Sequence, residues 1–246
     1  MFGAIKDELI FPIDNFSDFQ DSDSMKLTDS INVKEVQFML PVSPSKIVCV
    51  GRNYTEHAKE LGNEVPTTPL LFLKAPSALI LDGDSILIPE QSNQVEHEGE
   101  LAVVIGRECR KLTENNNPFE YVFGYTCLND VTARDIQRKD VQFTRGKSFD
   151  TFCPIAAFIE TDLDVSDVGV TTRVNSVIKQ AGRTSQMVFP VEFLIRYISN
   201  QMTLNAGDII ATGTPAGVSK MNDGDICEVE IEGIGILRNP IAKSQS

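Results

Sequence analysis

Short apolar runs recur along most of this chain, separated by polar stretches that contain glycine or proline. The run Lys46-Ile-Val-Cys-Val50 predicts a buried strand, and similar runs predict strands at 70–74, 85–88, 95–105, 121–129, 154–160, 207–212 and 225–237. Helical spacing predicts helices at 133–140 and 190–200, the second of them amphipathic. Because strands outnumber helices and do not alternate with them, the pattern favours an α+β or mostly β fold over a doubly wound one.

The first 42 residues differ from the rest of the chain. Phe2–Ile13 predicts a short hairpin, whereas Asp14–Asp29 is polar and acidic, which is typical of a loop. Pro41 and Pro44 then precede the first core strand. We therefore expect a short N-terminal segment over 1–42 and one larger domain over 43–246.

A short helix of about two turns is predicted directly after the first core strand. Asn53 and Glu56 match an N-cap with its capping box, and Gly62 supplies a stop. His57 and Glu60 are three residues apart, so they share one face of this helix. A glutamate beside a histidine can orient the imidazole and raise its basicity; the alternative is a surface histidine near an exposed acid.

Composition narrows the possible functions. The chain has 246 residues, of which 41% are hydrophobic and 23% charged, so an ordinary core can form. Its net charge of −13 predicts a surface that repels nucleic acids and anionic membranes. No apolar run approaches the ~20 residues of a membrane helix, and the first residues lack a signal-peptide pattern. We therefore expect a cytoplasmic protein with neither kind of partner.

Cysteine and histidine content limits the possible metal sites. The five cysteines have no CxxC spacing, so a zinc ribbon or a disulfide framework is not expected, and we interpret them as small core residues. Only two histidines exist, which excludes a site with three histidine ligands.

Acidic residues form the most informative pattern. Glu96, Glu98 and Glu100 occupy every second position just before a strongly apolar run, so in a strand they would face the same way and repel one another. A hard divalent cation would relieve this repulsion, because Mg²⁺ and Mn²⁺ prefer oxygen ligands; the alternative is a solvated edge of unpaired acids. Asp130 ends a second apolar run and is well placed to join them, although it could also cap the next helix.

Six short motifs follow one another along residues 46–240. They are Gly51-Arg-Asn-Tyr54 with His57 and Glu60, Phe72-Leu-Lys74, His97-Glu-Gly-Glu-Leu101, Asn129-Asp-Val-Thr-Ala-Arg-Asp-Ile-Gln137, Lys147-Ser-Phe149 and Gly207-Asp-Ile-Ile-Ala-Thr-Gly-Thr-Pro215. In this order they resemble the fumarylacetoacetate hydrolase family, in particular its single-domain acylpyruvase-like and hydroxyheptadienedioate isomerase-like members.

The resemblance implies a mixed β-roll fold with few short helices, usually a homodimer, preceded by a short variable segment. It implies that Glu98, Glu100 and Asp130 hold Mg²⁺ or Mn²⁺, with Ca²⁺ as a substitute in crystals. Glu96 lies outside that trio. His97 should face away from the trio and serve packing or support.

Further roles follow from the resemblance. His57 and Glu60 would form a catalytic pair on a helix that closes over the substrate. Lys147 would point into the site and stabilise negative charge on a substrate oxygen, although spacing alone does not exclude Arg145.

Three more residues are candidates for binding the substrate. Thr214 would contact the substrate carboxylate; the alternative is that its segment serves only as a tight turn. Gln137 and Arg52 are the other two candidates.

The predicted activity is divalent-metal-dependent hydrolysis of the C–C bond of acylpyruvates, or decarboxylation of oxaloacetate, through a metal-bound pyruvate enolate. The water-activating pair favours these reactions. One alternative is an isomerase or tautomerase of 2-oxo or 2-hydroxy-diene dicarboxylic acids. The short stretch 138–146, which contains Phe143 and no Trp, resembles the corresponding stretch of the isomerase-like members of the family. Others are a catalytically silent relative that binds metal and oxo acid, and an acidic protein without metal. The expected partners are a small 2-oxo acid and a second copy of the chain.

Overall fold

The computed structural model describes residues 2–6, 8–13 and 30–244. The chain divides into two compact units, Met1–Met39 and Leu40–Ser246. The smaller unit holds a three-stranded antiparallel sheet in the order β1 (Phe2–Lys6), β2 (Leu9–Ile13) and β3 (Ile31–Asn32), which confirms the predicted hairpin. The loop expected at Asp14–Asp29 lies outside the described residues, and the boundary near residue 43 stays a prediction.

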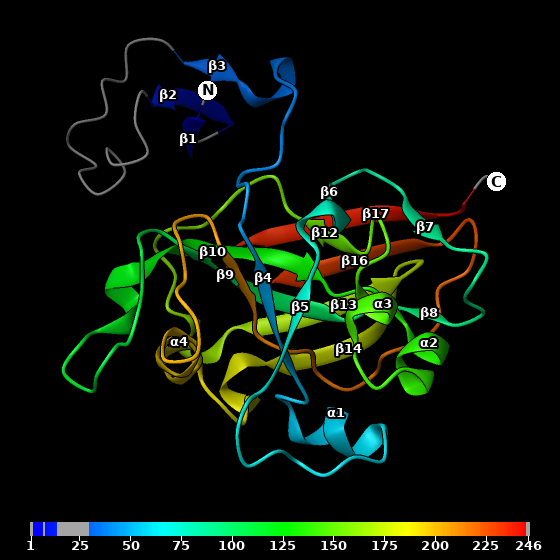
Figure 1. Ribbon diagram of the computed structural model, residues 1–246. Helices are drawn as coiled ribbons and strands as arrows, with labels where there is room; N and C mark the ends of the chain where they lie inside the picture. The colour runs from blue at the N-terminus through cyan, green and yellow to red at the C-terminus, as the bar shows by residue number, and fades with distance from the viewer. Residues whose placement is uncertain (1, 7, 14–29, 245–246) are drawn as a thin grey trace. The chain divides into compact units, whose positions relative to one another are not determined.

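Two sheets form the larger unit (Figure 1). The seven-stranded sheet has the order β5-β4-β15-β9-β10-β12-β6, and the five-stranded sheet has the order β14-β13-β16-β17-β7. The strands of the first are β5 (Leu70–Lys74), β4 (Ile47–Gly51), β15 (Ile209–Ala211), β9 (Gly99–Ile105), β10 (Val122–Asn129), β12 (Cys153–Ile155) and β6 (Leu79–Leu81). Those of the second are β14 (Val177–Arg183), β13 (Gly169–Val174), β16 (Ile226–Ile231), β17 (Gly235–Lys243) and β7 (Ile86–Ile88).

Short elements complete this unit. The ladder β8 (Val95–Glu96) with β11 (Thr132–Ala133) lies beside the sheets, and the α-helices are α1 (Thr55–Glu60), α2 (Arg134–Lys139), α3 (Thr144–Lys147) and α4 (Val191–Ser199). Parallel pairs (β4 with β15, β12 with β6, β17 with β7) occur among antiparallel ones. This mixed, mostly β arrangement with few short helices confirms the predicted α+β β-roll.

Strand β9 is buried on both faces, which explains its unbroken apolar sequence. Alternate residues pack into two different cores: Leu101 and Val103 join the core that includes α4, and Ala102 and Val104 join the other. All five cysteines are buried and free, as predicted for core residues.

Gly99, at the start of β9, lets the two sheets approach closely. A Cβ atom there would lie 2.1 Å from Oγ1 of Thr172 and 3.1 Å from Cγ1 of Val229, both on the facing sheet. The glycine between the two glutamates is therefore a packing requirement, and because side chains alternate along a strand, the carboxylates on either side of it point away from the second sheet.

Several predicted elements differ in detail from the structure. The strand expected over 95–105 is interrupted at 97–98, because β8 pairs with β11 whereas β9 pairs with β10. The strand expected over 225–237 is the β16–β17 hairpin, and the one over 154–160 is only Cys153–Ile155. The pattern missed β13 and β14. Strand β14 is an edge strand whose side chains are mostly exposed, and β13 alternates in burial but has a threonine at its central buried position.

Asn53 does not cap helix α1. Tyr54 takes the N-cap position without a side-chain hydrogen bond, and Asn53 is buried elsewhere. Its side chain accepts from Phe189 N at 2.8 Å and donates to the carbonyl oxygens of Phe189 and Thr212 at 3.0 and 2.7 Å. The capping interpretation was wrong because long-range backbone partners satisfy this amide.

Candidate metal centre and active site

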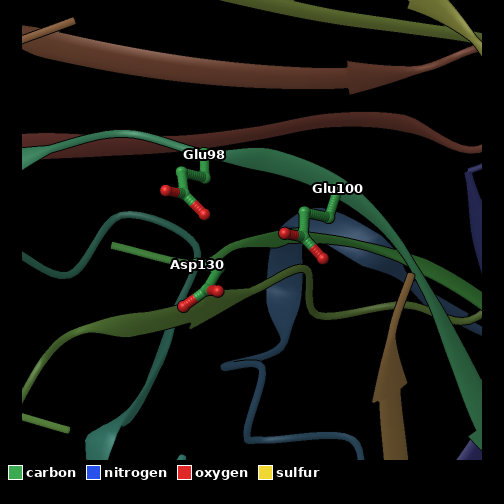
Figure 2. A group of neighbouring side chains, drawn as sticks. All are labelled: Glu98, Glu100 and Asp130. Carbon is green, nitrogen blue, oxygen red and sulfur yellow. The ribbon is translucent and has the colours of Figure 1, made fainter. Parts of the chain in front are cut away.

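Three buried carboxylates come together where strands β9 and β10 meet. Glu98 immediately precedes β9, Glu100 lies within it, and Asp130 follows β10. The strand register pairs Asn129 with Gly99, and Asp130 N donates to Glu98 O at 2.8 Å. One oxygen from each carboxylate lies within 4.8 Å of the others, and Figure 2 shows the three groups turned toward a common space.

Cationic side chains compensate part of this negative charge. Lys147 Nζ lies 2.8 Å from Glu98 Oε2 and 2.7 Å from Asp130 Oδ2, and Lys74 Nζ lies 2.6 Å from Asp130 Oδ1. Arg134 forms ion pairs with both Glu98 and Glu96. The like-charge repulsion that the sequence predicted is therefore relieved by buried lysine and arginine.

Glu96 is engaged outside the cluster. Its carboxylate accepts from Arg134 Nε at 2.7 Å and from Gln94 Nε2 at 2.6 Å. The three-carboxylate group that could hold a metal among the described residues does not include it.

Glu98 and Glu100 are held in opposite electrostatic environments. Burial alone would raise the pKa of Glu98, but Lys147 and Arg134 hold it well below its usual range. Burial raises the pKa of Glu100 well above its usual value, and the nearby Asp130 and Glu98 raise it further. Glu100 accepts a hydrogen bond from Gly213 N at 2.8 Å and forms no ion pair with any residue in the described part of the chain.

This donor set fits a hard divalent cation. All three ligand candidates offer carboxylate oxygen, which Mg²⁺ and Mn²⁺ prefer. Glu100 has the strongest need of a positive partner, because among the described residues only the backbone N–H of Gly213 bonds to its buried carboxylate. A cation among the three oxygens would supply that charge.

His57 lies on α1 and is 4% exposed. Its Nδ1 is 3.6 Å from Glu60 Oε2 and has no hydrogen-bond partner among the described residues. Glu60 itself accepts from Gly217 N at 3.0 and 3.1 Å. Burial lowers the pKa of His57, and Arg134 and Lys147 lower it further against the opposing effect of Glu98, so the imidazole is neutral near neutral pH. A neutral imidazole can accept a proton.

A cavity of about 290 Å³ brings most predicted site residues together. Its wall also contains the aromatic rings of Phe72 and Phe143. Glu60 does not line it and instead lies behind His57. The predicted site residues in the wall are Arg52, His57, Glu98, Glu100, Asp130, Gln137, Lys147 and Thr214.

Lys147 and Arg145 take different positions. The Lys147 ammonium is 2% exposed, lies 5.0 Å from the centre of the Phe72 ring and faces the cavity. Arg145 is exposed and pairs with Asp140, with both N–O distances 2.7 Å. Spacing along the sequence could not distinguish them. Both residues lie on α3, but only the Lys147 side chain points into the protein.

The three substrate-binding candidates differ in how many of their polar atoms already form hydrogen bonds within the protein. Gln137 Oε1 accepts from Arg134 Nη1 at 2.6 Å. Thr214 Oγ1 donates to Gly99 O at 2.8 Å, so its hydroxyl hydrogen is already used. Arg52 lies between β4 and α1, adopts a left-handed backbone conformation with φ of 59°, and lines the cavity.

Lys74 and Arg134 are charged site residues that the sequence reasoning did not assign. Both lie inside the quoted motifs, but no spacing rule says that a lysine ending a strand or an arginine starting a helix points inward. The available signal was the repulsion among the acids, which required buried positive charge without saying where it comes from.

The arrangement of charged groups around one cavity in a mixed β-roll is that of an enzyme. The chain belongs to the fumarylacetoacetate hydrolase family, because residues 46–242 match the family described as Fumarylacetoacetate (FAA) hydrolase C-terminal. The predicted resemblance is thereby confirmed. Members of this family generally use a divalent metal, which agrees with the buried acidic trio.

Similar proteins carry related activities in their names. Oxaloacetate tautomerase YisK of Bacillus subtilis is 41% identical over 225 residues, which cover 85% of this chain and 74% of that protein. The mitochondrial oxaloacetate decarboxylase of Dictyostelium discoideum is 46% identical over 196 residues, covering 77% and 89%. A solved structure described as 5-carboxymethyl-2-hydroxymuconate delta-isomerase from Mycobacterium smegmatis is 44% identical, with a TM-score of 0.82 and coverage of 89% and 86%.

No helix in the described ranges is long and apolar enough to cross a membrane.

Proposed function

We propose that this protein is a divalent-metal-dependent enzyme that converts a 2-oxo dicarboxylic acid of the oxaloacetate type through an enolate, by tautomerisation or decarboxylation. The observation that carries this proposal is a neutral imidazole, His57, in the wall of the same cavity as three buried carboxylates. The names of two relatives, an oxaloacetate tautomerase and an oxaloacetate decarboxylase, support the same substrate class.

Glu98, Glu100 and Asp130 would hold the cation. When bound there, the cation would supply Lewis-acid polarisation of the 2-oxo group. Lys147 adds a fixed positive charge: burial alone would lower its pKa, but Asp130 and Glu98 raise it above the ordinary value. The ammonium therefore stays protonated and can stabilise negative charge on the 2-oxo oxygen as the enolate forms.

His57 moves the proton. In tautomerisation its imidazole accepts a proton from C3, the electron pair of that C–H bond moves into the enolate, and a proton delivered to the 2-oxo oxygen completes the enol. Glu60 stabilises the imidazolium from 3.6 Å. In decarboxylation the C3–C4 bond breaks instead, its electron pair moves into the enolate as carbon dioxide leaves, and a proton taken from solvent through the His57 imidazole is then added to C3.

Three residues would orient the substrate. The Arg52 guanidinium and the amide of Gln137 line the cavity and suit a carboxylate. The Thr214 hydroxyl hydrogen is bonded to Gly99 O, so Thr214 would contact the substrate through its remaining lone pair or its backbone.

Hydrolysis of acylpyruvates is the second candidate. The placement of Glu60 beside His57 favours it, because an imidazole backed by a carboxylate can take a proton from water. The same cavity and the same enolate would serve that reaction. The homodimer implied by the resemblance stays a prediction, which sedimentation analysis would test.

Parallel assays test the proposal. Dialysed protein is incubated with Mn²⁺ and either oxaloacetate or acetylpyruvate, following the enol absorbance and the release of pyruvate. Metal-dependent loss of the oxaloacetate enol, or pyruvate formation from it, supports the proposal, whereas cleavage of acetylpyruvate alone assigns hydrolysis. Inactivity on both with metal present contradicts it.

Two glutamate variants make a matched pair for this assay. Glu98→Gln should abolish Mn²⁺ binding and turnover, since it removes a ligand. Glu96→Gln alters a neighbouring buried glutamate outside the trio and should keep Mn²⁺ binding. Equal loss in the two variants would contradict the ligand assignment.

A further inference from the structure

A buried hydrogen-bond network lies behind the carboxylate strand and includes Thr214 of the cavity wall. Its centre is Gln180 of β14, whose side chain is fully buried. Gln180 Oε1 is 3.0 Å from Gly99 N and 3.0 Å from His97 Nδ1. Its Nε2 is 2.7 Å from both Thr214 Oγ1 and Pro215 O.

The chemistry of the partners determines the orientation of this amide. Gly99 N–H can only donate, so it requires the amide oxygen, and the Pro215 carbonyl can only accept, so it requires the amide nitrogen. His97 must then donate from Nδ1, and its Nε2 accepts from Ser219 Oγ at 2.8 Å. Burial lowers the pKa of His97, which agrees with a neutral ring that carries one proton.

The network holds Gly99 at both of its backbone polar groups. Gln180 Oε1 accepts from its N–H, and Thr214 Oγ1 donates to its carbonyl oxygen at 2.8 Å while accepting from Gln180 Nε2. Gly99 stands directly between Glu98 and Glu100 in the chain. The backbone position of Gly99 therefore sets the distance between the backbone atoms from which the Glu98 and Glu100 side chains extend.

We propose that Gln180 is a positioning residue for the carboxylate cluster. Through Gly99 it holds Glu98 and Glu100 at the separation that a divalent cation needs, and through Thr214 it ties the same strand to the cavity wall. This inference rests on the proposed function, since it presupposes the cation. Residues that support ligands from behind in this way typically change metal affinity 10–100-fold when replaced.

Calorimetric titration with Mn²⁺ tests this role in the wild-type chain and in three variants. Gln180→Met keeps the length of the side chain without hydrogen bonds at the amide, and should raise the Kd for Mn²⁺ about 10–100-fold. Thr214→Val removes the hydroxyl that bridges Gln180 and Gly99, and should raise it several-fold. A role of Thr214 in substrate contact alone would leave the Mn²⁺ affinity unchanged.

Thr172→Val is the matched control. Thr172 lies opposite Gln180 in the β13–β14 pair and packs on Gly99, but its hydroxyl has no hydrogen-bond partner among the described residues. This variant should bind Mn²⁺ within twofold of wild type. Thermal unfolding of each variant monitors its fold.

The outcomes separate the two proposals. A wild-type chain that binds no Mn²⁺ overturns the proposed function and this inference together. If wild type binds and Gln180→Met and Thr214→Val stay within twofold of it, only the positioning role is wrong. Equal weakening in the Thr172→Val control would also overturn that role, as general packing damage. If Gln180→Met does not fold, the Thr214→Val affinity decides in the same way.

Discussion

Buried charge is balanced residue by residue in this site. Glu98 and Asp130 share Lys147, Asp130 also binds Lys74, and Arg134 joins Glu98 to Glu96. Each pair offsets the cost of taking a carboxylate out of water. Glu100 has no such partner in the described part of the chain, so we interpret it as the residue that most depends on a bound cation.

In the proposed mechanism, proton transfer depends on His57. We expect His57→Gln to lower turnover about 10²–10⁴-fold, because the side-chain amide cannot accept the proton. The Kd for Mn²⁺ should stay close to wild type, since His57 is not a ligand candidate. Steady-state kinetics and Mn²⁺ titration measure the two quantities. Unchanged turnover would remove His57 from the mechanism, and a large loss of Mn²⁺ affinity would reassign it to the metal.

At the scale of elements, the site depends on strand register and on the loop that contains Gly217. The pairing of Asn129 with Gly99 places Asp130 beside Glu98, and the loop at Gly217 fixes Glu60 behind His57. The sequence motifs contain His57, Glu60, Gly99 and Asn129, but the last motif ends at Pro215, before Gly217. They could not show that the Asn53 side chain bonds to residues more than a hundred positions away instead of capping helix α1, because such contacts depend on the packed chain.

Gly217 links helix α1, which carries the proposed catalytic pair, to strand β14 of the second sheet. Its φ is 105°, and a Cβ atom there would lie 1.9 Å from Lys179 O, so Gly217→Ala must displace the loop that holds Glu60. We expect turnover to fall about tenfold, with a loss of stability of about 1–3 kcal/mol from backbone strain and the clash. Kinetics and urea unfolding would measure these.

Gly224→Ala is the control for Gly217→Ala. Gly224 has φ of 85° but no atom within 4 Å of the position of a Cβ, so it reproduces the backbone strain without the clash. It should lose stability and keep turnover. If both variants keep full turnover, the Gly217 loop does not support the catalytic pair.

At the scale of the whole larger unit, one buried carboxylate joins segments far apart in the chain. Asp208 precedes β15 and accepts from Ser45 N at 2.9 Å, Lys46 N at 3.1 Å and Asn205 N at 2.7 Å, and it pairs with the Lys46 ammonium. These bonds secure the start of the parallel pair β4–β15. Burial alone would raise the pKa of Asp208, but the bonds from Lys46, Asn205 and Ser45 lower it overall.

Asp208→Asn should destabilise the protein by about 2–4 kcal/mol at pH 7, because it removes a buried charged acceptor from several donors. The folded pKa lies below the unfolded value of about 3.9, so the contribution is fully present above that pH and is lost as the pH falls through the folded pKa. Urea unfolding at pH 7 and pH 3 should therefore show a smaller difference between variant and wild type at pH 3.

Asp167→Asn provides the comparison for Asp208→Asn. Asp167 is exposed, and its carboxylate bonds to Arg183 and Ser185 at the surface. Its loss should change stability much less, since solvent screens an exposed pair. Equal effects at the two positions would show that the buried Asp208 bonds contribute no special stability.

The sequence by itself determined the α+β class, the family, and the trio Glu98, Glu100 and Asp130 as candidates for a metal site. Alternation within a strand grouped Glu96, Glu98 and Glu100 without separating them, and the family resemblance carried by the ordered motifs selected the trio, because both are local properties of the chain. The tertiary structure decided which cations relieve the repulsion, which of Lys147 and Arg145 points inward, and that Gln180 supports Gly99 from the second sheet. Those contacts join residues from separate strands and helices, and only the packing of the two sheets brings them within hydrogen-bonding distance.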